Sequence, residues 1–223
     1  VQVTVYRALY LDSVLKEGSG ITFYRDNLFR AVVRGMKSVE DSDYVVPASL
    51  VQVLRGYQKT GYRWLKTLDV NGFGGILADD MGLGKTIQII ALLQAEAQEH
   101  PESQSICPAS LVYNWENELK RFAPGLTVQT VTGTAPEREE ILRIAVQTGM
   151  ETTQAALKTA VIRHPQILIT SYDLLKRDIT CYEPFQFRFQ VIDEAQYIKT
   201  PLTQSAKSVT LIKAQTRCAL TGT

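Results

Sequence analysis

Hydrophobic and polar positions follow two different periods along most of the chain. Short apolar runs at 75–78, 167–169 and 189–192 are bounded by glycine, proline or polar residues, which is typical of buried strands. Apolar residues also recur at helical spacing, and over 85–98 they nearly surround the predicted helix, as expected for a helix buried beside a sheet. Strands that alternate with helices predict an α/β fold, with a doubly wound parallel sheet in three layers.

Weaker patterns extend this alternation over the rest of the chain. Further helices are predicted at 56–68, 115–122, 137–147, 152–163 and 201–214, and further strands at 126–131 and 218–220. Before Cys107, residues 102–106 supply only Ile106 as an apolar residue, so we expect the strand there to be short, frayed or shifted in register. The loops that follow parallel strands are expected to gather along one edge of the sheet.

Residues 1–49 alternate apolar and charged positions without a strong motif, and 45–49 read as an extended linker. We therefore expect an N-terminal appendage over 1–49 and one domain over 50–223. With 223 residues, of which 45% are apolar, the chain is long enough to bury one core of ordinary domain size.

The formal net charge is only +1, so an attraction to nucleic acid would have to come from local patches. The stretch 195–223 has no acidic residue, and its basic residues are Lys199, Lys207, Lys213 and Arg217. These basic residues are interpreted either as a solvated helix face or as a strip that faces phosphates, and the pattern does not decide between the two.

Three cysteines lie far apart without a C-x-x-C spacing, and His100 and His164 have no partner nearby in the sequence, so no metal site of this type is predicted. Cysteines in apparent strands are typical of core thiols in a reducing compartment. The sequence contains no long apolar stretch of transmembrane length and no signal-peptide pattern. We therefore expect a soluble, cytoplasmic chain with no membrane partner.

The strongest candidate for chemistry follows the first apolar run. Gly82 and Gly84 allow backbone N–H groups to turn toward an anion, and the helix predicted from Lys85 adds the partial positive charge of its N-terminus. In such a phosphate loop Lys85 would reach the β and γ phosphates, and the Thr86 hydroxyl would hold Mg²⁺. The general pattern G-x-x-x-x-G-K-[ST] is not met, because Asp79 stands at its first glycine.

Two adjacent acids, Asp193 and Glu194, end the apolar run at 189–192. A parallel sheet would bring them beside the phosphate loop, with Asp193 at the Mg²⁺ shell and Glu194 placed to orient and deprotonate water. Taken alone, an Asp-Glu pair after a strand is more often a solvated loop or a charge at a helix N-terminus. Its combination with the phosphate loop, in this order and with these flanks, favours a nucleotide site.

Three segments together resemble motifs I, II and III of the Swi/Snf-type ATPases, the DNA-translocating branch of helicase superfamily two. They are 79–86 (Asp-Asp-Met-Gly-Leu-Gly-Lys-Thr), 193–196 (Asp-Glu-Ala-Gln) and 220–223 (Leu-Thr-Gly-Thr). In that family the first position of the loop is commonly acidic, so Asp79 fits the resemblance. Weaker matches at 54–58, 107–115 and 169–172 fall in the family's order. The resemblance covers about residues 50–223, and the overall look is nearest to bacterial members.

The resemblance implies a first RecA-like lobe that binds ATP and Mg²⁺. It assigns nucleotide binding to Gln58, as the adenine reader, and to Asp80, Met81, Gly82, Leu83, Gly84, Lys85 and Thr86. It assigns catalysis to Lys85, Asp193 and Glu194, and Mg²⁺ binding to Thr86 and Asp193. Coupling between motifs II and III falls to Gln196, Thr221, Gly222 and Thr223, with the Gln196 amide in place of a histidine commonly found there.

The resemblance also implies contacts with the backbone phosphates of duplex DNA, which follow the strand without reading bases. These contacts would come from Ser110 and Asn114, and from Thr170, Ser171 and Tyr172. The residues alone leave a second interpretation open, because Ser, Thr and Asn at these places also suit helix N-caps.

The function implied by the resemblance is that of a DNA-dependent ATPase in the bacterial nucleoid, which couples ATP hydrolysis to movement along duplex DNA and remodels protein–DNA complexes. A DNA-bound protein is a further expected partner. The sequence stops within the third motif, so we expect a second RecA-like lobe of the same polypeptide, with the arginines that complete the ATP site, to lie outside it. Such arginines contribute about 10³- to 10⁵-fold in rate in related NTPases, so the chain alone is expected to be nearly inactive.

Two alternatives remain open. One is a P-loop NTPase that acts as a switch or assembly factor without nucleic acid, and the other is a non-catalytic domain that senses nucleotide. Neither needs the segment around Gln58 or the loop at 170–172, which is why the DNA-dependent ATPase is preferred.

Overall fold

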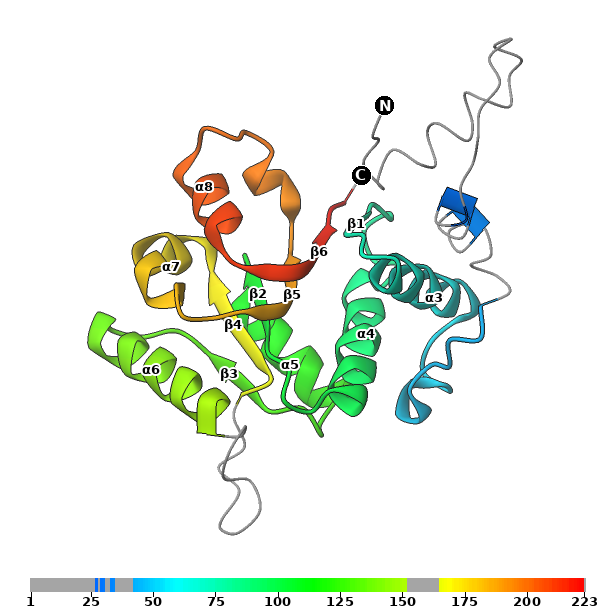
Figure 1. The fold of residues 1–223 in the computed structure, drawn as a ribbon, viewed down its shortest axis with the longest axis horizontal. Coiled ribbons are helices and arrows are strands. Elements are labelled where there is room, and N and C mark those ends of the chain that lie inside the picture. The colour runs from blue at the N-terminus through cyan, green and yellow to red at the C-terminus, as the bar shows by residue number, and fades with distance from the viewer. Residues whose placement is uncertain (1–26, 28, 31–32, 35–41, 152–164, 223) are drawn as a thin grey trace.

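The computed structural model describes residues 42–151 and 165–222, together with residues 27, 29, 30, 33 and 34. Within them, six parallel strands form one sheet in the order β1-β6-β5-β2-β4-β3. The strands are β1 (Gly75–Leu77), β2 (Ser105–Ala109), β3 (Val128–Thr130), β4 (Ile167–Ser171), β5 (Phe187–Ile192) and β6 (Ala214–Leu220). The predicted α/β fold with a parallel sheet is confirmed (Figure 1).

Helices connect the successive strands, as a parallel sheet requires, and one further helix, α3, precedes the first strand. They are α3 (Gly56–Val70), α4 (Lys85–Glu99), α5 (Val112–Phe122), α6 (Ala135–Glu151), α7 (Tyr172–Arg177) and α8 (Gln204–Leu211), with short 3₁₀ helices η2 (Ala48–Leu50), η3 (Ile179–Tyr182) and η4 (Ala195–Ile198). The predicted helices that fall on described residues are present. The one predicted at 152–163 lies outside them.

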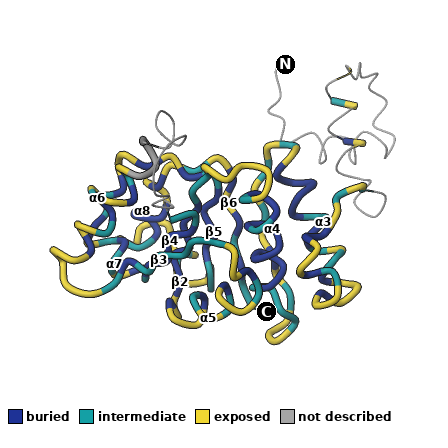
Figure 2. The backbone as a smooth tube through the Cα atoms, turned by 90° about the horizontal axis from the view of Figure 1, so that it is seen from below, coloured by how far each residue is buried: buried dark blue, intermediate teal, exposed yellow. Residues whose placement is uncertain are grey.

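Helices cover both faces of the sheet and make two separate cores. Ile167 and Ile169 of β4 pack with residues of α3, α4 and α5, whereas Leu168 between them packs with residues of α6, α7 and α8. In α4 every residue from Ile87 to Leu93 is buried, as its nearly continuous apolar surface predicts. α4 and the central strands β2, β4 and β5 are the most buried parts of the described chain (Figure 2). The three-layer arrangement is therefore confirmed.

The strand that was expected before residue 107 to be short, frayed or shifted in register lies at 105–109, so only Ser105 and Ile106 precede Cys107. It is neither short nor frayed. β2 is a buried strand of five residues that pairs with β4 along its whole length. Its pairing with β5 reaches only Ile106, and beyond this point Pro108 accepts the backbone N–H of Asp193 at 3.1 Å. In a strand, the N–H and the carbonyl of one residue point to the same side. The N–H that Pro108 lacks would therefore point toward β5, at a position beyond the residues through which β2 and β5 pair. The proline thus removes no hydrogen bond of that pairing.

The last strand is longer, and the preceding helix shorter, than the apolar pattern predicts. β6 begins at Ala214, which the pattern places in a helix, and it contains polar residues that are engaged by distant partners. Thr216 is buried and donates to Asp69 Oδ1 at 2.8 Å. The Arg217 guanidinium donates to Gln190 Oε1 at 2.9 Å and to the carbonyl of Ile212 at 2.7 Å.

The segment expected to be an extended linker packs onto the sheet domain instead. Val46 and Leu50 are buried in the first core, and the Tyr62 hydroxyl of α3 donates to the carbonyl of Val45 at 3.0 Å. Ala48 starts the 3₁₀ helix η2. Most of the appendage expected over 1–49 lies outside the described residues.

A buried ion pair joins α6 to the end of α7. Arg138 Nε lies 2.6 Å from Asp178 Oδ2, and Arg138 Nη2 lies 2.8 Å from Asp178 Oδ1. A third nitrogen of the guanidinium donates to the carbonyl of Gly133 at 2.7 Å, so the loop between β3 and α6 is held as well. Both charged residues are buried, so each relies on the other in place of water.

Candidate nucleotide-binding site

The loop between β1 and α4 has the backbone geometry of an anion cradle. Gly82 and Gly84 have φ angles of 84° and 74°, in the left-handed region that glycine adopts without steric cost. α4 begins directly after Gly84, and its first turn has neither a capping side chain nor an acidic residue. The N–H groups and the partial positive charge of this helix end therefore suit a phosphate.

Lys85, the first residue of α4, reaches back over the loop. Its ammonium donates to the carbonyl oxygens of Asp79 at 2.7 Å and of Asp80 at 3.0 Å. The Asp79 carboxylate in turn accepts a hydrogen bond from the Gln88 amide of α4, with 3.4 Å between Oδ2 and Nε2. This contact gives Asp79 a part in holding the loop to the helix, at the position where the general pattern has glycine.

Gln58 joins the start of α3 to the same loop. Its Nε2 donates to the carbonyl of Leu83 at 2.9 Å, and its Oε1 accepts the backbone N–H of Arg55 at 2.9 Å. The side chain is buried, and the neighbouring Tyr57 hydroxyl also donates to Leu83, at 3.1 Å. The structure thus gives the Gln58 amide a role in holding the loop, while its contact with adenine stays a prediction.

The two acids that follow β5 lie at the same edge of the sheet as the phosphate loop. β5 and β1 are both neighbours of β6, and all three strands run in the same direction, so their carboxyl ends meet (Figure 1). The pKa of Asp193 is raised above its ordinary value, mainly because burial removes water from the carboxylate, and the Glu194 charge adds to this rise. A hydrogen bond from Trp115 and the positive charge of Lys85 oppose the rise without cancelling it. The Lys85 ammonium is therefore close enough to act on this acid.

Asp193 is held by hydrogen bonds from three other segments of the chain. Its carboxylate Oδ2 accepts the indole N–H of Trp115 at 3.0 Å, and its backbone N–H donates to Pro108. Its backbone carbonyl accepts the hydroxyl of Tyr172. The sequence places Trp115 in a predicted helix and at the end of the family match over 107–115, and neither pattern indicates this bond. The signal available was that a buried indole N–H usually finds a hydrogen-bond partner.

Glu194 has an unusual backbone conformation. Its φ of 48° and ψ of 53° lie in the left-handed region, and among the described residues it is the one non-glycine residue with a positive φ. This conformation costs an L-residue about 1 to 2 kcal/mol, and such strain is often found at functional sites. It turns the chain sharply between β5 and η4.

A side-chain amide connects the acidic pair to the end of β6. Gln196 Nε2 donates to Glu194 Oε2 at 2.5 Å, and Gln196 Oε1 accepts the Thr221 hydroxyl at 3.1 Å. The backbone N–H of Thr221 donates to Leu77 at the end of β1. Next to it, a Cβ on Gly222 would lie 3.1 Å from Met81 Cγ of the phosphate loop. The second and third motifs and the loop are therefore contiguous, whereas Thr223 lies outside the described residues.

The two residues expected to contact DNA at the start of α5 are on the surface. Ser110 and Asn114 are both exposed. The N-cap position of α5 is Leu111, and no side chain caps this helix, so the interpretation of Ser110 or Asn114 as an N-cap is wrong.

The second expected DNA-contacting group is mostly turned inward. The hydroxyl of Thr170 is buried and donates to the carbonyl of Val131 at 3.4 Å, and the hydroxyl of Tyr172 is used by Asp193. Ser171 is half-buried and caps α7, since its oxygen accepts the N–H of Leu174 at 3.2 Å. The expectation that the hydroxyls of Thr170 and Tyr172 face DNA is therefore corrected, because both residues are buried. Ser171 caps α7, as the second interpretation expects, and its contact with DNA stays a prediction.

All four basic residues near the C-terminal end, Lys199, Lys207, Lys213 and Arg217, are exposed. Lys213 donates to the carbonyl of Glu183 at 2.9 Å, and Arg217 donates to Gln190 of β5 and to the carbonyl of Ile212 at the end of α8. Exposure fits both a solvated face and a strip that faces phosphates, so the two interpretations stay open.

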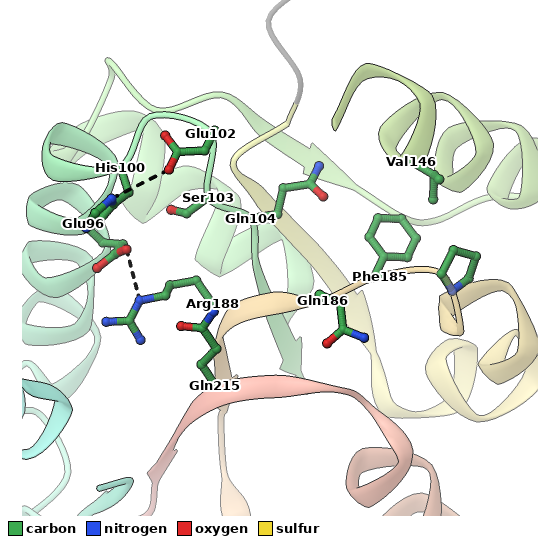
Figure 3. A pocket seen from close by; sticks show the side chains of 11 residues that line it. Glu96, His100, Glu102, Ser103, Gln104, Val146, Phe185, Gln186, Arg188 and Gln215 are labelled. Atoms are coloured by element: carbon green, nitrogen blue, oxygen red, sulfur yellow. Dashed lines mark hydrogen bonds and ion pairs between the residues drawn. The ribbon is translucent and has the colours of Figure 1, made fainter. Parts of the chain in front are cut away.

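A cavity of about 450 Å³ lies at the opposite edge of the sheet, where the strands begin. It is lined mainly by polar residues, among them Glu96, His100, Gln104, Arg188 and Gln215 (Figure 3). Arg188 pairs there with Glu96 and, at 2.6 Å, with Asp69. These pairs fasten α3 and α4 to β5, and the cavity is separate from the nucleotide edge.

Two absences hold for the part of the chain that the structure describes. No cluster of three or more His, Cys, Asp or Glu residues in this part of the chain is arranged to hold a metal ion. No helix in it is long and apolar enough to cross a membrane.

Comparison with known proteins places this chain in a family. A model of the SNF2-related domain matches residues 57–223. An uncharacterized ATP-dependent helicase of Mycoplasma pneumoniae is 36% identical over 205 residues, which cover 88% of this chain and 18% of that protein. The chromatin-remodeling ATPase INO80 of Sclerotinia sclerotiorum is 33% identical over 186 residues, which cover 82% of this chain and 10% of that protein.

The fold agrees with a solved structure as well. The SWI2/SNF2 ATPase core of Sulfolobus solfataricus in complex with double-stranded DNA superposes with a TM-score of 0.61 at 36% identity, covering 82% of this chain and 34% of that chain. The chain thus spans less than a fifth of the length of the two curated relatives. From the family model, the relatives and the shared fold, the chain belongs to the SNF2-related family.

Proposed function

We propose that the chain is the first RecA-like lobe, over residues 50–223, of a DNA-dependent ATPase that couples ATP hydrolysis to movement along duplex DNA. The observation that carries this proposal is the meeting of Lys85, the Asp193 and Glu194 pair, and Thr221 at one edge of the parallel sheet. The similarity to a helicase-like ATPase core solved on double-stranded DNA supports the choice of DNA over a nucleotide switch.

The residues at this edge fit a nucleotide with its magnesium ion. The first turn of α4 has no side-chain cap, and a Cβ at Gly84 would lie 2.5 Å from Gln58 Nε2, so the backbone there approaches its neighbours closely. Thr86 and Asp193 supply a hydroxyl and a carboxylate, the oxygen ligands that Mg²⁺ prefers alongside phosphate and water. When bound, the ion would neutralise charge on the phosphate oxygens.

Each side chain has a separate task in this proposal. The loop N–H groups and Lys85 hold the phosphates, and Thr86 and Asp193 hold the ion. Glu194 orients a water molecule and accepts its proton. Gln196 and Thr221 connect this acid to the end of β6.

The DNA partner and the second lobe belong to the same proposal. Ser110 and Asn114 are exposed beside the N-terminus of α5, where they are placed to meet backbone phosphates. A second RecA-like lobe would add the arginines that the phosphates lack here. The lobe described would then bind nucleotide weakly and hydrolyse it slowly by itself.

Nucleotide use is tested by titrating a fluorescent ATP analogue with Mg²⁺ into the chain. Lys85→Ala should weaken binding by about tenfold or more, since a charge-assisted contact to phosphate contributes about 1.5 to 3 kcal/mol. The matched control is Lys120→Ala on the far end of α5, where the lysine only pairs with Glu116. Equal affinities of the two variants would refute the assignment of the loop.

Contact with DNA is tested by filter binding of duplex DNA over a range of salt concentrations. Counterion release makes affinity fall steeply with salt if phosphates are contacted. The double variant Ser110→Ala, Asn114→Ala should reduce binding, whereas Gln147→Ala at an exposed position of α6 should not. A chain that binds ATP but shows no salt-dependent binding to DNA would instead favour a nucleotide switch.

A further inference from the structure

We infer that Trp115 and Tyr172 are positioning residues that hold Asp193 from the two segments expected near DNA, and so couple DNA binding to magnesium-dependent nucleotide binding. The inference rests on the proposed function, and it concerns how the two ligands sense each other. It replaces a direct DNA contact by Tyr172, which the structure does not allow, with a role inside the protein.

The bond from Trp115 comes from the segment 107–115. Trp115 is 1% exposed in the first core, and its indole N–H reaches Asp193 Oδ2 at 3.0 Å. In the same segment Pro108 accepts the backbone N–H of Asp193. Exposed Ser110 and Asn114 lie between these two anchors in the sequence. A phosphate that moves the surface of this segment would therefore act on a chain that is tied to Asp193 on both sides.

The bond from Tyr172 comes from the segment 169–172. Tyr172 is the first residue of α7 and is 8% exposed, and its hydroxyl donates to the carbonyl oxygen of Asp193. The half-buried Ser171 is the adjoining residue that reaches toward solvent.

The three bonds together leave Asp193 little freedom. Trp115 fixes one carboxylate oxygen, while Pro108 and Tyr172 fix the backbone on both sides of the side chain. Glu194 follows Asp193 directly in the chain and has a left-handed backbone. Because the two residues are adjacent, a small rotation at Asp193 also changes the direction of the Glu194 side chain. Displacement of either surface segment is thereby passed to both acids.

Thermodynamic linkage makes this testable by binding alone. If DNA raises the affinity for magnesium-ATP, magnesium-ATP must raise the affinity for DNA by the same factor. Such factors are about 5- to 150-fold in coupled systems. In the 223-residue chain we expect a factor of about fivefold or more. Tyr172→Phe and Trp115→Phe should each bring this factor close to one.

The two variants remove the hydrogen-bond donors and keep an aromatic ring. Tyr172→Phe removes a single oxygen, whereas Trp115→Phe removes the N–H together with part of a buried indole and so also leaves a cavity in the core. Tyr62→Phe and Trp64→Phe on α3 are the controls, because they delete the same atoms from a helix that does not touch Asp193. Both controls should retain the coupling factor of the original chain.

The readout separates positioning from a structural role. ATP affinity measured in EDTA, and DNA affinity measured without nucleotide, should stay within about twofold in Tyr172→Phe, while the magnesium-dependent gain and the coupling factor fall. Equal losses with and without magnesium would show that the residues only stabilise the fold and would overturn the inference. An unchanged coupling factor in both variants would overturn it as well.

A spectroscopic measurement gives an independent answer. The chain has two tryptophans, so Trp64→Phe leaves Trp115 as the single indole N–H signal. Duplex DNA should shift this signal, and Tyr172→Phe should reduce the shift. If the chain binds DNA and ATP but DNA leaves the signal and the ATP affinity unchanged, the inference fails while the proposed function stands. If the chain binds neither ligand, the proposed function itself fails.

Discussion

The side-chain amide of Gln58 donates to the carbonyl oxygen of Leu83 across 2.9 Å, and this bond joins α3 to the phosphate loop. It connects residues 25 positions apart, and the same amide also holds the first turn of α3 through the N–H of Arg55. The shape of the loop therefore depends on a helix that precedes the first strand.

Replacing Gln58 by alanine should weaken the binding of ATP and of GTP by similar factors. Two hydrogen bonds are lost, each contributing about 1 kcal/mol, so we expect a decrease in affinity of roughly fivefold to thirtyfold for both nucleotides. Titration of fluorescent ATP and GTP analogues measures it. Gln94→Ala is the control, because Gln94 bonds only to exposed Ser49. A loss confined to ATP would show instead that the amide reads the adenine base.

Alanine at Gly84 should distort the loop. Its φ of 74° costs an L-residue about 1 to 2 kcal/mol, and the new Cβ would lie 2.5 Å from Gln58 Nε2. We expect the free energy of unfolding to fall by about 2 kcal/mol and ATP binding to be lost. Gly125→Ala, where no heavy atom lies within 4 Å of the new Cβ, should change stability by less than about 0.5 kcal/mol. Urea denaturation measures the free energy of unfolding of the two variants. Equal values would contradict the prediction that alanine at position 84 is strained.

The buried pair of Arg138 and Asp178 should show strong non-additivity. Asp178→Ala leaves a buried guanidinium without its partner and should lower the free energy of unfolding by about 3 to 5 kcal/mol. The double variant Arg138→Met, Asp178→Leu should recover most of this loss, because apolar residues of similar size need no counter-charge. A double-mutant cycle by urea denaturation measures the coupling. Additive losses would mean that the two charges do not depend on each other.

Stability should decline above pH 9 because of buried thiols. Burial raises the pKa of Cys218 from its ordinary 9.0 to about 12, and it also raises the pKa of Cys107. Above pH 9 the unfolded chain loses protons that the folded chain keeps, so each thiol lowers the free energy of unfolding by up to about 1.4 kcal/mol per pH unit. Below pH 9 the thiols keep their protons in both the folded and the unfolded chain, so this loss of stability is absent.

Urea denaturation at pH 8 and pH 10 tests this pH dependence. Cys218→Ala should reduce the difference between the two values by about 1 kcal/mol, even if the loss of the sulfur lowers both. Cys181→Ala, which removes a half-buried thiol, is the matched control. The same difference in Cys218→Ala as in the original chain would contradict the prediction.

The parts of the fold that sequence patterns predicted correctly are those whose strands are apolar on both sides. The runs at 167–169 and 189–192 became β4 and β5, because a strand covered by helices on both faces needs apolar residues throughout. β2 and β6 were harder to predict. Thr216 is buried beside Asp69, a partner 147 positions away, and only the strand order brings the two together.

In the candidate site, too, some features could be predicted from local sequence and others could not. The phosphate loop and the acidic pair follow from local motifs, because their chemistry depends on neighbouring residues. The bonds of Trp115 and Tyr172 to Asp193 span 78 and 21 positions, and no local pattern indicates them. Side chains expected to face DNA, such as Thr170, were mistaken because burial is set by the helices that pack on the sheet.

The phosphate loop extends from a strand at the edge of the sheet as far as the chain is described. Among the described residues β1 pairs over three residues with β6 alone, whereas β2 lies between β5 and β4. Backbone amides of β1 should therefore exchange with deuterium through small local openings, while those of β2 exchange only when the whole domain unfolds. Such openings would let the loop reshape around a ligand while the rest of the sheet stays rigid.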